Sequence, residues 1–156
     1  MTISAKLRLI SFIVSIFVFI VIVLAALEAY KERSAILEAQ SLNTLSQKLS
    51  FVIHETQKER GMSAGFLGSK GAKFGDKLPS QREATAQKYK ELQEYLAEAD
   101  MTNFGTELQD ELKGFDEEMG KIESIRSSVS AQSIAQKDAI SYYTKMNEKI
   151  LSIVSM

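Results

Sequence analysis

An uncharged apolar run near the N-terminus constrains the fold of this chain more than any other feature. The run LISFIVSIFVFIVIVLAAL, from Leu9 to Leu27, has 19 residues and no charged side chain. A helix of that length can cross a hydrocarbon core of about 30 Å. A cleaved signal peptide would have a shorter apolar region, of about 7–15 residues, and a clearer small-residue cleavage site. We therefore expect residues 9–27 to form an uncleaved transmembrane signal anchor.

The charges around this run predict its orientation. Lys6 and Arg8 are the only charged residues before Glu28, and basic residues favour the cytoplasmic side of a membrane. The sequence thus predicts a cytoplasmic N-terminus over residues 1–8 and a single pass through the inner (cell) membrane. Residues 28–41 are expected to form a membrane-proximal helical stalk. Residues 42–156 are then expected to form a periplasmic or extracellular helical domain.

The composition excludes several classes of function. The chain has no cysteine, one histidine, one proline and a formal net charge of -1. Disulfides, thiolate metal sites and histidine-based catalytic triads are therefore not expected. No basic face suggests nucleic acid as a partner. Because no nucleophile–base pair or phosphate-binding loop is visible, we predict no enzyme, no catalytic residue, no metal and no cofactor.

The spacing of apolar residues predicts helices throughout. They recur at intervals of three and four rather than two. We expect four helices, beginning and ending near residues 28–67, 80–96, 104–129 and 136 to the C-terminus. Two capping boxes are predicted at the second and fourth helix starts, at Ser80 with Glu83 and at Ser133 with Gln136. The predicted fold is all-α, with an N-terminal transmembrane helix that continues into an antiparallel four-helix bundle.

Two apolar segments do not fit a self-contained bundle. The later helices are shorter than the first, so Ile36 and Leu37 should lack partners within the chain, which favours a coiled-coil homodimer. The last residues, KILSIVSM, are still apolar and helical in pattern. We expect the chain to be a fragment of a longer protein, a natural truncation being the alternative.

A single arginine interrupts the apolar stripe of the first helix. On a helical wheel at about 100° per residue, Arg60 falls in the middle of the stripe that Leu49 defines. Thr56 and Ser63 lie on the same face one turn to either side, and Glu59 lies at its margin. On the second helix Arg82 falls on the apolar stripe in the same way.

A guanidinium group that faces a bundle interior needs an anion, because it cannot lose its proton. One interpretation is an internal carboxylate, with Glu111 and Glu118 as candidates. The other is a bound small anion, held by Arg60 and by the hydroxyl groups beside it. The wheel does not choose between them. Gly61 and Gly65 likewise have two interpretations: they permit another helix to approach closely, or they mark the frayed end of a helix entering a loop.

Three segments together resemble a known family. The segments QKERGMSAGFLGSKG, FGDKLPSQREAT and YYTKMNEKIL resemble the nitrate- and nitrite-sensing (NIT) domain of bacterial receptors, over roughly residues 40 to 156. The resemblance implies an all-helical sensor outside the membrane, heading methyl-accepting chemotaxis receptors, sensor kinases or cyclases. It also implies that the arginine matching Arg60 binds nitrate or nitrite. A complete domain of this family has two bundles, with a second arginine supplied by the later half, so this chain would be the first half.

These observations predict the extracytoplasmic sensor region of a transmembrane chemoreceptor, with a cytoplasmic signalling module beyond the chain. The predicted anion ligands are Arg60, Thr56, Ser63 and Arg82, with Gly61 and Gly65 as positions of close helix approach. One alternative is a four-helix receptor domain for another ligand or for a partner protein. Another is a purely structural, membrane-anchored oligomerising bundle in which Arg60 only pairs with a carboxylate.

Overall fold

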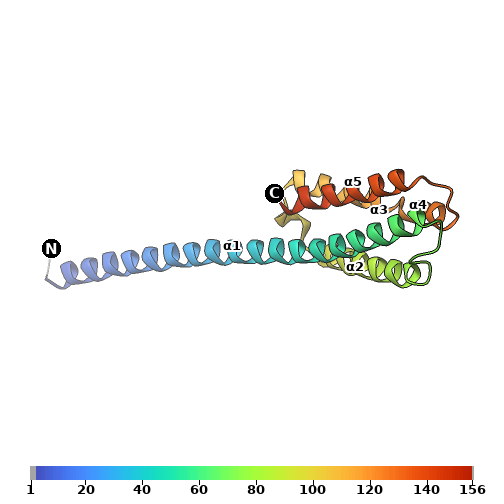
Figure 1. The fold of residues 1–156 in the computed structure, drawn as a ribbon. Helices are drawn as coiled ribbons and strands as arrows, with labels where there is room; N and C mark the ends of the chain where they lie inside the picture. Colours follow the sequence, from blue (N-terminus) through green and yellow to red (C-terminus); the bar gives the residue numbers. More distant parts are fainter. Residues whose placement is uncertain (1–2, 156) are drawn as a thin grey trace. The chain divides into compact units, whose positions relative to one another are not determined.

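The computed structural model describes residues 3–155, except for the side chains of residues 5–10 and 103. Within this part every regular element is helical (Figure 1). The elements are α1 (Ile3–Gly68), α2 (Leu78–Glu98), a short 3₁₀ turn η1 (Met101–Asn103), α3 (Thr106–Met119), α4 (Ile122–Ser130) and α5 (Gln136–Val154). The predicted all-α class is confirmed. Met1, Thr2 and Met156 lie outside the described residues, as do the side chains of Lys6 and Arg8 on which the orientation was predicted.

The chain divides into two units, residues 1–40 and 41–156. The first consists of the N-terminal part of α1. The most apolar 18-residue window of this helix has a mean hydropathy of 2.9, and none of it is buried. Phe12, Phe17 and Phe19 are each about two-thirds exposed. Because a helix that is apolar on all sides is typical of a lipid environment, α1 carries a candidate membrane span where the sequence predicted one.

The second unit is a bundle of four helical segments: residues 41–68 of α1, α2, α3 followed by α4, and α5. Successive segments run in opposite directions (Figure 1), and α3 packs along α5. Buried apolar side chains from all four segments form the core, which accounts for the spacing of three and four in the sequence. The main cluster contains Leu45, Leu49, Val52, Leu92, Phe104, Leu108, Leu112, Phe115, Met119, Ile122, Tyr143, Met146, Ile150 and Ile153.

The two predicted capping boxes are wrong. Helix α2 begins at Leu78 rather than near Ser80, and the Ser80 hydroxyl donates backwards to the Lys77 carbonyl. Pro79 lies in the first turn, where its missing N–H has no intrahelical partner to lose. At α5 the N-cap is Ala135, without a side-chain cap, and the Ser133 hydroxyl donates to the Ser128 carbonyl. In both places the hydroxyl satisfies a carbonyl of an earlier turn instead of a helix N–H.

The predicted third helix is divided in two. Helix α3 ends with Gly120 as its C-cap, and α4 begins after Lys121. Glycine is less favourable than alanine inside a helix by roughly 1 kcal/mol, which makes this a weak point. Met119 and Ile122 on either side of the break are both buried. The apolar spacing therefore continues across the break and gives no sign of it.

Candidate functional site

The buried stripe of α1 becomes polar halfway along the bundle. Leu45, Leu49 and Val52 are followed at the same spacing by Thr56, Glu59 and Ser63, all of them buried. Glu59 is 0% exposed, whereas Arg60 is only partly buried. The prediction that Arg60 lies in the middle of the stripe and Glu59 at its margin is therefore wrong.

The reason is the drift of a bundle stripe along a straight wheel. The buried positions of α1 alternate between steps of four and three, a mean period of 3.5, whereas an ideal helix has 3.6 residues per turn. Such a stripe moves by about 20° per heptad relative to the wheel. Two heptads beyond Leu45 the centre lies between Glu59 and Ser63, and Arg60 is left roughly 80° away from it at about 100° per residue. Arg60 consequently lies at the edge of the bundle interior.

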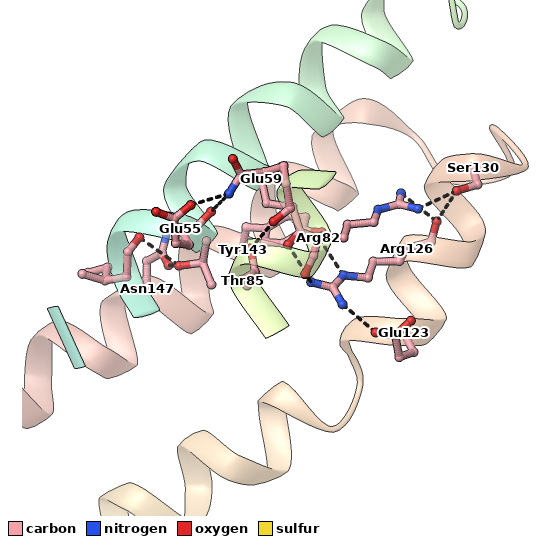
Figure 2. A network of polar contacts seen from close by, with 12 residues as sticks. Glu55, Glu59, Arg82, Thr85, Glu123, Arg126, Ser130, Tyr143 and Asn147 are labelled. Carbon is pink, nitrogen blue, oxygen red and sulfur yellow. Dashed lines mark hydrogen bonds and ion pairs between the residues drawn. The ribbon is translucent and has the colours of Figure 1, made fainter. Parts of the chain in front are cut away.

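Glu59 is the centre of a buried polar network (Figure 2). Arg126 on α4 binds it with two parallel hydrogen bonds, from Nε to Oε1 and from Nη2 to Oε2, both 2.7 Å. The Tyr143 hydroxyl on α5 donates to Oε1 at 2.8 Å. Nη1 of Arg126 reaches the exposed Glu123 at 2.6 Å. This bidentate geometry is the strong form of a carboxylate–guanidinium pair, and it joins α1, α4 and α5 through one carboxylate.

The charges of this network are stable within the protein. Burial alone raises the pKa of Glu59, but the hydrogen bonds and charge of Arg126, together with the Tyr143 and Thr85 hydroxyls, outweigh burial and lower that pKa. Burial alone lowers the pKa of Arg126, and its bonds to Glu59 and Glu123 raise it above the ordinary value. Burial beside the Glu59 carboxylate raises the pKa of Tyr143, which therefore remains a donor. The cluster is thus an ion pair with a neutral phenol, and it is fully formed at neutral pH.

Arg82 on α2 is part of the same network but on its far side. Its Nη2 donates to the Arg126 carbonyl at 3.1 Å and its Nη1 to the Ser130 hydroxyl at 2.8 Å. In return Nη2 of Arg126 donates to the Arg82 carbonyl at 3.2 Å. The Arg82 guanidinium thus lies against the last turn of α4, where a helix favours a cation. Its Nε is buried without a hydrogen-bond partner in the described part of the chain.

Arg60 has a different environment. Its Nη1 donates to the Thr144 hydroxyl on α5 at 3.2 Å. Neither predicted carboxylate forms an ion pair with it in the described chain: Glu111 pairs with Lys149 and Glu118 with Lys121. Among the described residues no carboxylate lies within the 4.0 Å of an ion pair. Arg60 is therefore a partly buried cation bound only to a neutral hydroxyl.

The other predicted ligands do not converge on Arg60. The Thr56 hydroxyl faces the interior and lies 2.6 Å from Asn147 Oδ1 on α5. Ser63 is also interior, and its Oγ has no hydrogen-bond partner within the described residues. Arg82 contacts α4, whereas Arg60 contacts α5. The four residues thus lie in three places, and an anion-binding role for each of them stays a prediction.

The two glycines predicted to permit close helix approach differ from each other. Gly61 is exposed, and a methyl group added to it would have no atom within 4 Å. At Gly65 the same methyl would lie 2.5 and 2.7 Å from the ring of Phe74, in the loop between α1 and α2. In the described chain Gly65 therefore accommodates a loop side chain rather than a helix. The loop itself contains Gly71 at φ +87°, a backbone conformation that favours glycine.

The sequence pattern alone does not single out Glu59, Arg126 and Tyr143 as site residues. A signal for two of them was present, since Glu59 continues the 45–49–52–56 spacing and Arg126 lies between the buried Ile122 and Val129 at steps of four and three. A carboxylate and a guanidinium that both occupy core positions of one bundle predict a buried pair. A helical wheel centred on Leu49 conceals the core position of Glu59, because the buried stripe drifts over the one to two heptads that separate the two residues.

Comparison with known proteins identifies the family. No curated protein and no solved structure matches the chain. The family model described as nitrate and nitrite sensing, NIT, matches residues 52–156, which is more than half of the chain. The matched region begins in the buried stripe of α1 and includes Glu59, Arg60, Arg126 and Tyr143. The chain therefore belongs to the nitrate- and nitrite-sensing (NIT) family of sensor domains.

Proposed function

We propose that this chain is the extracytoplasmic sensor region of a transmembrane receptor of the chemotaxis type. In this proposal it binds nitrate or nitrite at Arg60 and passes a displacement through α1 to a cytoplasmic signalling module. The observation that carries the proposal is the state of Arg60. It is partly buried, its one hydrogen bond goes to a neutral hydroxyl, and no described carboxylate pairs with it.

The chemistry of the anion fits this guanidinium. A guanidinium group has five N–H donors in one plane and is weakly hydrated. Nitrate is flat, monovalent and also weakly hydrated, so desolvating the pair costs less than for a compact, strongly hydrated anion. Arg60 and Thr144 present an N–H fork and a hydroxyl between α1 and α5. We propose Thr144 as a ligand in addition to the predicted set.

Transmission needs two helix arrangements that the anion distinguishes, because a ligand shifts an equilibrium only by its differential affinity. An anion bound between α1 and α5 would replace or lengthen the Arg60–Thr144 contact. Helix α1 continues without interruption from Ile3 to Gly68, so it contains both Arg60 and the candidate membrane span.

Ile36 and Leu37 are exposed, and we propose that they face a second copy in a homodimer.

The proposal is tested by the melting temperature of the full chain in nanodiscs, with and without nitrate or nitrite. We expect the anion to raise the melting temperature of the natural protein, because a ligand of the folded state stabilises it. The Arg60→Ala variant should lose this rise, and Arg60→Lys should keep only part of it, since an ammonium lacks the planar fork.

Lys58→Ala is the matched control. Lys58 lies two residues from Arg60 on the same helix, but it is exposed and paired with Glu55. We expect this variant to retain the full response to nitrate. Chloride and sulfate at equal ionic strength separate binding from a general salt effect. An unchanged nitrate response in Arg60→Ala would exclude Arg60 as the anion ligand.

A further inference from the structure

A cavity lies between α2 and α3, and its lining includes neither Arg60 nor the residues of the Glu59 network. Its volume is about 300 Å³, at the lower end of the range for small-molecule sites. Its wall is mainly apolar. Leu92, Leu112 and Phe115 are buried behind it, and Tyr89 packs edge-to-face on Phe115 with the ring centroids 6.0 Å apart. An apolar group of a few carbon atoms would fit this space.

Three polar residues of α3 line the same cavity. Gln109, Lys113 and Asp116 are spaced by four and three, so they lie on one face of the helix. The Gln109 amide nitrogen donates to the Met101 and Phe104 carbonyls at 2.9 and 2.8 Å. Since both of its hydrogens are then used, Gln109 Oε1 is the atom left to accept a further hydrogen bond.

Asp116 is held in place at this rim from the opposite helix. The Tyr89 hydroxyl and the Gln93 amide, both on α2, donate to Asp116 Oδ1. These neutral donors orient the carboxylate without neutralising it. Its Oδ2 has no hydrogen-bond partner among the described residues.

Lys113 and Asp116 do not neutralise each other, although they are neighbours on α3. Residues at i and i+3 lie on the same side of a helix, and a pair with the cation first is the less favourable order. Neither residue forms an ion pair of 4.0 Å or less within the described chain. The mouth of an apolar cavity thus carries one free cation and one uncompensated carboxylate, side by side.

We propose that this cavity binds a small zwitterion with an apolar side chain, that is, an apolar α-amino acid. Its ammonium group would bind the free Oδ2 of Asp116, and its carboxylate would bind Lys113 one turn earlier on α3. Its side chain would lie against Leu92, Leu112 and Phe115. Such a ligand is neutral overall and satisfies both charges at once, which a simple anion, a simple amine or a hydrocarbon does not.

The test is isothermal titration of the full chain in nanodiscs with leucine and phenylalanine. The analogues 3-phenylpropionate and phenethylamine each lack one charge of phenylalanine, and glycine lacks the side chain. We expect one or both of the apolar amino acids to bind, and all three comparison compounds to bind at least tenfold more weakly. Lys113→Ala and Asp116→Asn should each weaken binding at least tenfold, and Asp116→Asn preserves the contact with Tyr89.

Lys121→Ala is the matched control, because Lys121 is exposed between α3 and α4 and does not line the cavity. It should bind as the natural protein does. Leu96 also lines the cavity, so Leu96→Trp should fill it and abolish binding, with circular dichroism verifying that the bundle is folded. Arg60→Ala should leave amino-acid binding unchanged, which separates this site from the proposed nitrate site. The proposal would be overturned if neither leucine nor phenylalanine bound, or if the singly charged analogues bound as tightly as phenylalanine.

Discussion

At the scale of single residues, the buried pair of Glu59 and Arg126 is the main electrostatic feature of the bundle. Glu59 is 0% and Arg126 6% exposed. Removing two charges from water costs several kcal/mol per ion, and their mutual attraction offsets this only with good geometry and further hydrogen bonds. Here the geometry is bidentate, and Tyr143 satisfies the carboxylate further. The pair is therefore expected to be important for keeping α1 and α4 in one arrangement rather than for net stability.

A double-mutant cycle tests this at the same scale. Arg126→Met leaves a carboxylate buried without its cation and should destabilise the bundle by about 3–5 kcal/mol. Glu59→Met should cost less, because Arg126 keeps the exposed Glu123 as a partner. The double variant should be close to the natural protein or more stable, giving a strongly favourable coupling energy. Urea unfolding of the full chain in micelles, followed by circular dichroism, measures all four proteins, with the exposed Glu83→Met as control. Additive losses in the double variant would contradict this account.

The residue scale also shows what the sequence could and could not predict. Apolar core positions such as Leu45, Leu49 and Val52 follow from periodicity, because burial of apolar surface dominates folding. The burial of Glu59 and the position of Arg60 at the edge of the core did not follow from periodicity. Both depend on a drift of the buried stripe of about 20° per heptad, which accumulates along the helix. The partner of Glu59 is 67 residues away in sequence. Such a contact requires the packing of the helices and not only their faces.

At the scale of elements, two glycines of α1 offer a direct comparison of backbone and packing effects. Alanine at an exposed helical glycine is favourable by roughly 0.5–1 kcal/mol. Gly61→Ala should show this gain, because its added methyl meets no atom within 4 Å. Gly65→Ala should lose the gain or destabilise the protein, because the methyl would push the Phe74 ring from the end of α1.

The measurement is the melting temperature of both variants, with Phe74→Ala as a second background. In that background the ring is absent, so Gly65→Ala should recover the stabilisation seen at Gly61. If Gly65→Ala stabilised the natural protein as much as Gly61→Ala, the ring contact would be unimportant and the glycine would have only a loop-entry role.

The elements themselves were mostly predictable, and the boundaries were not. Long amphipathic segments with one proline in the chain favour helices strongly. The start of α2 at Leu78 was missed because Ser80 and Glu83 have capping-box spacing, whereas proline is also well suited to a first turn. The break at Gly120 was missed because the buried positions keep their spacing across it.

At the scale of the whole molecule, membrane orientation decides whether the bundle meets external nitrate. Lys6 and Arg8 precede the apolar run, and cytoplasmic retention of such charges would place the bundle outside the cytoplasm. The chain has no cysteine, so a single introduced cysteine can be labelled without background from other thiols of the protein.

We predict that Lys90→Cys, exposed on α2, reacts in intact cells with a membrane-impermeant maleimide. Thr2→Cys should react only after the membrane is permeabilised. The unsubstituted chain is the control for background labelling. The reverse pattern would place the bundle in the cytoplasm. Labelling of both positions in intact cells would contradict a single span through α1. In either case Arg60 could sense only an anion on the side of the membrane where the bundle lies.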